Sequence, residues 1–519
     1  MDSAQCWKYL ARTGSNMKQL SGLDNVFLQL ERGNQHMHVA GLAIYDPSTA
    51  PEGRVRFKDV LRFFEARLDA SPIFRRRLVP VPIAADRPYW VEDAVIDVEF
   101  HVRHIALPQP GDWRQLCIQV ARIHSRPLDR SKPLWEAYVI EGLDNIAGLP
   151  RGSFALYVKF HHCALDGEAG TEIIKAIHSL SADDAGETRA AARRVRDRNP
   201  SAVELYSRAV ANNLGRFPRM TRLAVESAGR FARLGRSALP SRPGDGRVPP
   251  DLKALVRRAP VTRFSGRVSA HRVVESVGLS LSAMRAVRAA VEGTTLNDVF
   301  LATVGGALNL YLASKNELPA QSMTAMVPMT LRGANKGEDA GNQIGLAVMR
   351  LHTEIADPIA RLRAIRADAG KVKALSDDLG KDLAKQVFEV MPTFAATALT
   401  RNLMVPQMNV VVSNVRGPDV PLYMAGARLV SFAAVSIAID GLGLNVTAFS
   451  YHGTMCLCAV ACREMLPDPA FFAECLQRSF QALTDAAPPP LKPAPRSARR
   501  RRKSAPPRRT PRASRAASA

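Results

Sequence analysis

The stretch from residue 154 to residue 180 constrains the fold most, because a strand pattern, a polar turn and a helix pattern follow one another directly. Its first part alternates, and one face consists of Phe154, Leu156, Val158 and Phe160. That period of two, rich in aromatic and β-branched residues, predicts a strand. The last part repeats apolar residues at helical steps, as on a buried helix face, at Ala169, Ile173, Ile177 and Leu180. His161 and His162 therefore lie where a strand ends and a tight turn begins, a rigid and exposed place to present a base to a substrate.

The length of the chain bounds its organisation. A chain of 519 residues is too long for one ordinary domain and suggests two or three. With 46% hydrophobic and 23% charged residues, most of it can fold around sizeable cores. The first twenty residues lack the apolar segment of a signal peptide. The best candidate for a membrane span, residues 433–449, is interrupted by Asp440. We therefore expect a soluble or peripheral protein.

The seven cysteines are odd in number and scattered, which does not suggest a disulfide framework. A reducing cytoplasm is the expected location. Cys456, Cys458 and Cys462 lie close together, but their spacing fits no zinc motif and the segment reads as an apolar strand. We expect buried free thiols there and no metal site.

The net charge of +23 is concentrated at the C-terminus. Residues 486–519 hold eleven Lys or Arg and no acidic residue, so about +12 remains for the rest of the chain. This Pro-, Ala- and Arg-rich tail cannot bury a core and is expected to be disordered. It could bind anionic lipid, contact nucleic acid through phosphates alone, or have no specific partner. No specific nucleic acid is expected.

A basic segment separates the two halves of the chain. Residues 201–240 carry seven Arg against two Glu, with an apolar helical stripe at Val203, Tyr206, Val210, Leu214 and Phe217. Interruptions at Pro218, Gly229 and Gly235 predict two short amphipathic helices. Two interpretations stay open. The segment either lies in a membrane interface or is a connector whose apolar side packs on the protein.

Several motifs occur in the order found in one enzyme family. They are LSGLDNVFL at 20–28, HMHVAGL at 36–42, PLW at 133–135, HHCALDG at 161–167, Asn297-Asp298, and a strand at 409–415 that ends in a Gly417-Pro418 turn. HHxxxDG resembles the signature of acyltransferases related to chloramphenicol acetyltransferase and to peptide-synthetase condensation domains. The whole set, from about residue 19 to 483, resembles the bacterial wax ester synthase/diacylglycerol acyltransferase family. Arg416 stands where that family usually has proline.

The resemblance implies an α/β fold in which two chloramphenicol acetyltransferase-like domains form a pseudo-dimer joined by a helical connector. We assign the domains to residues 1–195 and 261–484, the connector to 196–260 and the basic tail to 485–519. Only the first domain carries HHxxxDG, and the groove between the domains would admit both substrates.

The implied activity is transfer of a long-chain fatty acyl group from acyl-CoA to diacylglycerol or a fatty alcohol. Imidazole suits a general base near pH 7, and the resemblance gives that role to His162. Because successive strand side chains point to opposite faces, His161 is expected to support it. In the family Asp166 is chiefly structural and pairs with an arginine, and Gly167 allows the turn.

Three further residues carry expectations. Asn297 is expected near the active centre as the candidate oxyanion donor, although Thr295 and Asp298 form a capping pair that explains the helix start by itself. Trp135 is expected to contact substrate, or else to be a large apolar anchor in the core. Cys163 is an alternative nucleophile because it lies beside two histidines. Acyl-CoA would be a substrate, and no cofactor is expected.

Two other functions stay open. The chain could be a catalytically silent protein that coats lipid inclusions or a membrane surface, or a condensation-type enzyme that uses carrier-bound acyl groups. As an acyltransferase it would lie in the cytoplasm, peripheral to the inner face of the membrane or to lipid inclusions.

Overall fold

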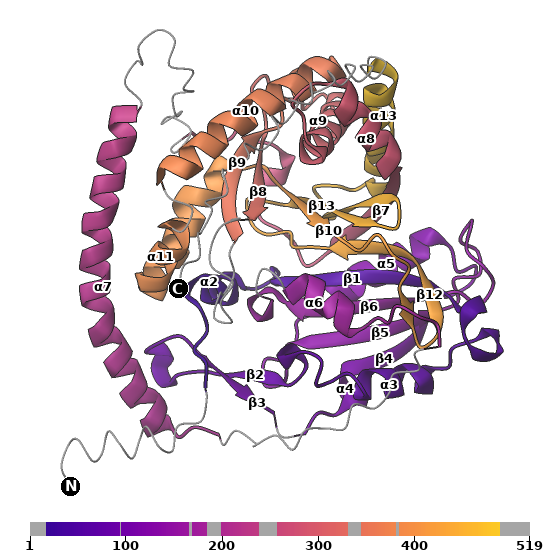
Figure 1. The fold of residues 1–519 in the computed structure, drawn as a ribbon, viewed down its shortest axis with the longest axis horizontal. Coiled ribbons are helices and arrows are strands. Elements are labelled where there is room, and N and C mark those ends of the chain that lie inside the picture. Colours follow the sequence, from indigo (N-terminus) through magenta and orange to yellow (C-terminus); the bar gives the residue numbers. More distant parts are fainter. Residues whose placement is uncertain are drawn as a thin grey trace, which may run out of the picture.

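A computed structural model describes residues 17–93, 95–165, 169–183, 199–237, 257–330, 344–379 and 383–487. Two six-stranded sheets, one in each half, form its framework. Figure 1 shows the second sheet between the first sheet and a cover of helices, with the helix α7 running along one side of both halves.

The first sheet has the order β11-β12-β1-β6-β5-β4 and is antiparallel except for the parallel pair β4 and β5. Two of its strands come from the C-terminal half of the chain, so that half contributes to the first sheet as well as forming the second. The strands are β1 (His38–Asp46), β4 (Val102–Ala106), β5 (Trp135–Glu141), β6 (Phe154–His161), β11 (Tyr423–Met424) and β12 (Ala427–Val435).

Helices and a small ribbon complete the N-terminal half. The helices are α2 (Gly22–Leu30), α3 (Phe57–Glu65), α4 (Val98–His101), α5 (Trp113–His124) and α6 (Ala169–Ala176). The ribbon consists of β2 (Arg76–Val79) and β3 (Tyr89–Glu92). The predicted helix after the HHxxxDG turn is present, but it ends at Ala176. The prediction that Leu180 lies on its buried face was wrong, because that side chain is 75% exposed.

The second sheet has the order β7-β14-β13-β10-β8-β9. Its strands are β7 (Arg272–Ser280), β8 (Thr324–Thr330), β9 (Ile344–Arg350), β10 (Val410–Arg416), β13 (Leu444–Tyr451) and β14 (Thr454–Cys462). The helices of this half are α8 (Leu281–Ala290), α9 (Leu296–Ser314), α10 (Pro358–Leu379), α11 (Leu383–Val390), α12 (Thr393–Leu399) and α13 (Pro469–Ala486). Among the described residues α9 alone is long and apolar enough to cross a membrane, but 72% of that window is buried inside the protein. It is therefore the central helix of the C-terminal core.

The connector forms one continuous helix, α7 (Ala202–Ser237), with Pro218 inside it. The prediction of two short helices was wrong. An internal proline costs a helix about 3 kcal/mol, but Ala, Leu and Arg, which favour helices, make up much of this segment. The predicted stripe is also not packed on the protein: Val203, Leu214 and Phe217 are 79%, 72% and 73% exposed. The interpretation of a connector buried on its apolar side is thereby excluded.

Candidate active site

The alternation along β6 separates the two histidines. Leu156, Val158, Phe160 and His162 line one cavity, whereas His161 is buried on the other face, where it pairs in register with His38 of β1. Side chains at paired positions of neighbouring strands share a face of the sheet. The predicted division into opposite faces is what the strand produces.

The cavity next to His162 has a volume of about 270 Å³ and lies between the two halves. Strands β1, β6 and β12 and helix α6 form one wall, and β8, β10 and β13 form the other. Apart from His162, the polar side chains on its surface are Ser413, Ser436 and Thr447. A mostly apolar space with a few polar groups is typical of sites for apolar ligands.

His162 is held as a neutral base at the cavity wall. Its ring stacks on Phe27 of α2, with ring centroids 3.9 Å apart, and its main-chain N–H donates to the Met37 carbonyl at 2.7 Å. Burial, with a smaller effect of His161, lowers the pKa of His162 to about 4. Its Nδ1 atom is enclosed and has no hydrogen-bond partner among the described residues. The imidazole is therefore uncharged at neutral pH.

His161 is fixed by two hydrogen bonds. The Cys163 main-chain N–H donates to Nδ1 at 3.1 Å, so the Nε2–H group is free to donate to Glu31 Oε2, 2.9 Å away. Burial alone would raise the pKa of the Glu31 carboxyl group, but contacts with His161 and His36 hold that pKa well below its usual range. With both ring nitrogens engaged, His161 orients the turn and is not placed to accept a substrate proton.

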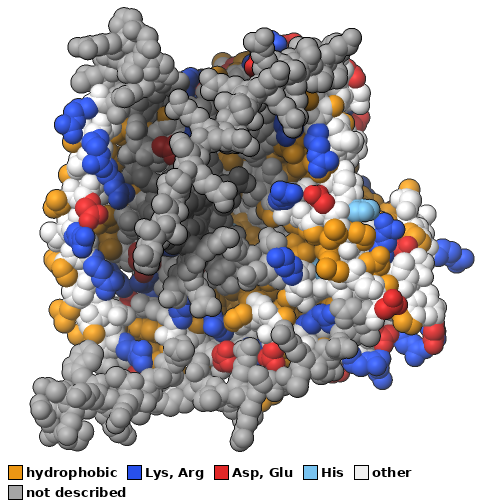
Figure 2. Space-filling model, viewed as in Figure 1, with side chains coloured by type: hydrophobic (Ala, Val, Ile, Leu, Met, Phe, Trp, Pro, Cys, Tyr) orange, Lys and Arg blue, Asp and Glu red, His pale blue; other side chains and the backbone are white. Residues whose placement is uncertain are grey.

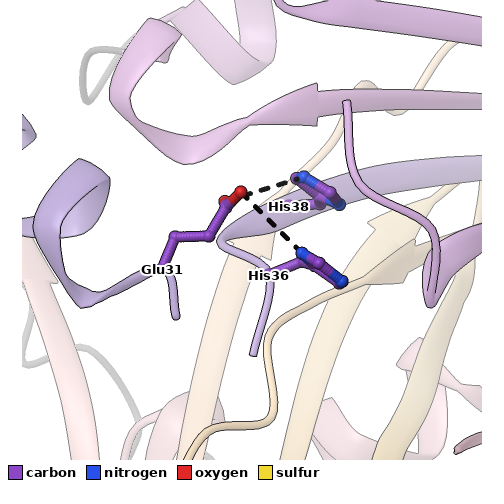
Figure 3. A group of neighbouring side chains, drawn as sticks. All are labelled: Glu31, His36 and His38. Atoms are coloured by element: carbon purple, nitrogen blue, oxygen red, sulfur yellow. Dashed lines mark ion pairs between the residues drawn. The ribbon is translucent and has the colours of Figure 1, made fainter. Parts of the chain in front are cut away.

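Glu31 also approaches two further histidines, as Figure 3 shows. The ligand atoms of Glu31, His36 and His38 lie within 4.8 Å of one another, a set that could surround a zinc ion. The same carboxylate, however, accepts hydrogen bonds from His161 and the Met37 main chain. Its other oxygen lies 3.1 Å from the Arg130 guanidinium. Because this carboxylate is already neutralised, the group fits a hydrogen-bonded support of the site better than a metal centre.

The other predicted site residues are placed as follows. Asn297, at the start of α9, accepts from the Asn414 amide at 3.4 Å. Asn414 is the strand neighbour of the cavity residue Ser413, but Asn297 is not itself part of the cavity surface. Trp135 is completely buried, and its indole N–H donates to the Phe74 carbonyl at 3.1 Å. That environment matches the interpretation of Trp135 as a core anchor. The side chain has no exposed surface with which it could contact a substrate.

Cys163 is not an activated nucleophile. It packs in a small apolar cluster with Leu20, Leu78 and Leu134, and burial raises the pKa of its thiol well above the usual value. A thiol held in its neutral form is a poor nucleophile. The predictions for Asp166 and Gly167 lie outside the described residues.

Sequence reasoning missed two residues that contact the histidines of the candidate site, Phe27 and Glu31. Phe27 belongs to the LSGLDNVFL motif, and Glu31 follows that motif by three residues. Ser21 caps the start of α2, where its hydroxyl accepts from the Asp24 main-chain N–H at 3.1 Å. This helix carries Phe27 to His162, and Glu31 directly follows it. An acidic residue beside a motif was the available signal, but the spacing alone does not reveal contact with a strand 130 residues away.

Comparisons with known proteins agree on one family. The model of the wax ester synthase/diacylglycerol acyltransferase catalytic domain matches residues 20–300, and that of the C-terminal domain matches residues 340–484. A probable diacylglycerol O-acyltransferase of Mycobacterium tuberculosis is 32% identical over 477 residues, covering 89% of this chain and 98% of the relative. The O-acyltransferase WSD of Acinetobacter baylyi is 31% identical over 465 residues, covering 87% and 93%.

Solved structures show the same relationship. The wax ester synthase/diacylglycerol acyltransferase of Marinobacter aquaeolei aligns with a TM-score of 0.63 at 26% identity, over 91% of this chain and 99% of that one. The starter condensation domain of rhizomide synthetase aligns with a TM-score of 0.52 over 92% and 97% of the two chains. At 13% identity that second likeness shows the two-domain acyltransferase fold alone.

Proposed function

Because the chain belongs to the wax ester synthase/diacylglycerol acyltransferase family, we propose that it moves a long-chain fatty acyl group from acyl-CoA to the hydroxyl of a diacylglycerol or a long-chain alcohol. Membership makes the protein an acyltransferase and sets aside a catalytically silent lipid-coat protein. The observation that carries the proposal is a neutral His162 in the wall of an apolar cavity between the two halves.

In the proposed reaction His162 is the general base. Its unprotonated nitrogen takes the alcohol proton as the alcohol oxygen attacks the thioester carbonyl carbon. The tetrahedral intermediate collapses, the carbon–sulfur bond breaks, and the imidazolium returns the proton to the departing CoA thiolate. Nδ1 is enclosed, so Nε2 is the nitrogen that would face the alcohol. This route needs no covalent acyl-enzyme and agrees with the inert environment of Cys163.

The cavity suits the acyl chain. Its surface beside His162 is made of aliphatic and aromatic side chains from both halves, including Val158, Ile173 and Phe449. An apolar chain that enters such a space loses contact with water, which supplies binding energy in proportion to the area buried. We assign Asn297 a supporting role through β10, because Asn414 links it to the strand that carries Ser413.

The His162→Ala variant tests the proposal. Loss of a general base lowers kcat by about 10² to 10⁴-fold. The kcat for acyl transfer from palmitoyl-CoA should therefore fall by that factor with diacylglycerol and with hexadecanol, which are assayed in parallel. The Cys163→Ala variant is the matched control and should keep activity with an unchanged melting temperature. Full activity of a folded His162→Ala protein would rule out the proposed mechanism. The parallel assay also identifies the preferred acceptor.

A further inference from the structure

Helix α7 has two chemically distinct sides. With 100° per residue, its seven arginines and two glutamates fall within about 160° of the circumference, and the opposite sector of about 200° carries no charged residue. Large apolar side chains of this uncharged sector are exposed: Val203, Tyr206, Val210, Leu214, Phe217, Met220, Val225 and Phe231. We call these eight residues the outer stripe.

A different face of α7 holds the helix on the protein. Leu205 and Ala209 are buried against Tyr89 and Val91 in a satellite core. The Asn212 amide donates to Asp86 and to the Tyr89 hydroxyl, and Arg216 pairs with Asp86 at 2.7 Å. Leu234 is also buried, near the other end. The outer stripe is therefore not the face by which α7 packs on the described residues.

Single exposed apolar residues are ordinary on protein surfaces, but a continuous stripe marks an interaction surface. The stripe extends over most of a helix about 54 Å long. Figure 2 shows basic and apolar side chains together along the edge of the molecule that α7 occupies in Figure 1. Because arginines lie beside the stripe, this surface is complementary to a partner with an apolar interior and a negatively charged surface.

We propose that the outer stripe of α7 is the surface by which this protein binds an anionic phospholipid bilayer. The helix lies parallel to the bilayer, with the stripe at the boundary between headgroups and acyl chains and with Arg222 and Arg236, the arginines that follow the stripe on its far side from Asp86, at the phosphates. Ile83 supports the same surface. It is 88% exposed, and its loop is tied to α7 where the Asn213 amide donates to the Ala85 carbonyl.

Vesicle flotation of the full chain, without substrates, tests this surface. Wild-type protein should float with phosphatidylcholine vesicles that contain phosphatidylglycerol. The double variant Leu214→Ser/Phe217→Ser should bind at least about tenfold more weakly, as should a second pair, Val203→Ser/Val210→Ser. Leu180→Ser removes an equally exposed leucine away from α7 and should bind like the wild type.

Arg222→Gln/Arg236→Gln tests the charge. Each basic residue near an anionic surface adds about 1 kcal/mol, or about fivefold in affinity. This variant should therefore lose most of its preference for phosphatidylglycerol while keeping its weaker binding to phosphatidylcholine alone.

Two results would overturn the proposal. One is that both stripe variants float with vesicles as well as the wild type does. Other segments, such as the basic tail, would then be responsible for vesicle binding. The other is a wild-type dimer in sedimentation velocity that the stripe variants dissociate without any change in flotation, because the stripe would then pair two copies. Activity towards a water-soluble short-chain acyl-CoA and alcohol should be the same in all variants. The proposal for the membrane-binding surface and the proposal for the reaction can thus be rejected independently.

Discussion

Single hydrogen bonds set the roles of the two adjacent histidines. Because the Cys163 N–H donates to Nδ1 of His161, the proton of that ring is on Nε2 and points to Glu31. His162 has no such partner for Nδ1 among the described residues and is kept neutral by burial. Identical side chains one position apart thus acquire different chemistry from their surroundings.

The Glu31→Gln variant isolates the support that His161 receives. The amide keeps the size of the side chain but loses the charge that accepts from His161, so we expect kcat to fall about tenfold with little change in KM. Arg130→Gln is the control, since it removes a half-exposed partner of the same carboxylate and leaves the His161 hydrogen bond in place. Unchanged kcat in both Glu31→Gln and Glu31→Ala would show that the contact with His161 is only structural.

The pH dependence of the reaction follows from the lowered pKa of His162. A base with a pKa of about 4 is already unprotonated at pH 6. We therefore expect kcat/KM to rise with pH through about 4 and to be level from pH 6 to 8. A rise centred near 6.5, the ordinary value of histidine, would mean that the free enzyme hydrates His162 more than the structure shows. Steady-state kinetics with a short-chain acyl-CoA measures this profile.

At the scale of elements, strand β12 carries residues of the C-terminal half into the cavity wall that the first sheet forms. It leaves the C-terminal half, pairs with β1 of the first sheet and contributes Phe432, Ala434 and Val435 to the cavity wall. The Phe432 ring lies over Gly41 of β1, where an added Cβ would come within 2.6 Å of it. The same ring packs on Phe449 with centroids 4.4 Å apart.

This contact predicts a chain-length effect. Gly41→Val should push Phe432 into the cavity and lower kcat/KM for palmitoyl-CoA about tenfold more than for a short-chain acyl-CoA, since one or two methylenes in an apolar pocket carry that much discrimination. Adding Phe432→Ala should restore use of the long chain. An equal loss for both chain lengths, with no rescue in the double variant, would place the acyl chain elsewhere.

The predictability of these elements differed for physical reasons. Local patterns gave β6, the opposite faces of His161 and His162, and the Thr295–Asp298 capping pair, which is confirmed. Strand β12 was not predicted, because pairing with a strand nearly four hundred residues away leaves no local signal. The environment of Trp135 likewise depends on side chains from other elements. The motif order predicted the family and the two-domain fold, but the domain boundaries stay a prediction.

Helix α7 shows the opposite kind of error. The apolar stripe was recognised in the sequence, but periodicity cannot tell whether a stripe faces protein or another partner. The structure supplies that answer, because Leu205, Ala209 and Leu234 fill the buried face instead. The prediction of two short helices also gave too much weight to the proline and the glycines, since a long helix with many favourable residues tolerates them.

At the scale of the whole molecule, buried neutral histidines link separate elements, and one of them, His124, connects the two halves. His124 of α5 accepts from the Tyr157 hydroxyl at 2.7 Å and donates to the Ser436 carbonyl at 2.9 Å, next to β12. His178 accepts from the Tyr45 hydroxyl and donates to the Ile174 carbonyl, both at 2.7 Å. Burial, the largest cause in each case, lowers the pKa of His124 to about 3 and that of His178 to about 4.

These shifts predict that mild acid destabilises the protein. Below pH 6.5 the histidines of the unfolded chain bind protons, while His124, His162 and His178 stay neutral in the fold down to about pH 4 or below. The unfolded state then holds more protons, so the free energy of unfolding falls as pH falls, by up to about 1.4 kcal/mol per pH unit for each such histidine. Urea unfolding at pH 7, 6 and 5 measures how steeply the free energy of unfolding depends on pH. The His178→Gln variant should have a smaller slope, by the contribution of one histidine. A slope that this substitution leaves unchanged would mean that His178 is accessible to protons in the folded protein.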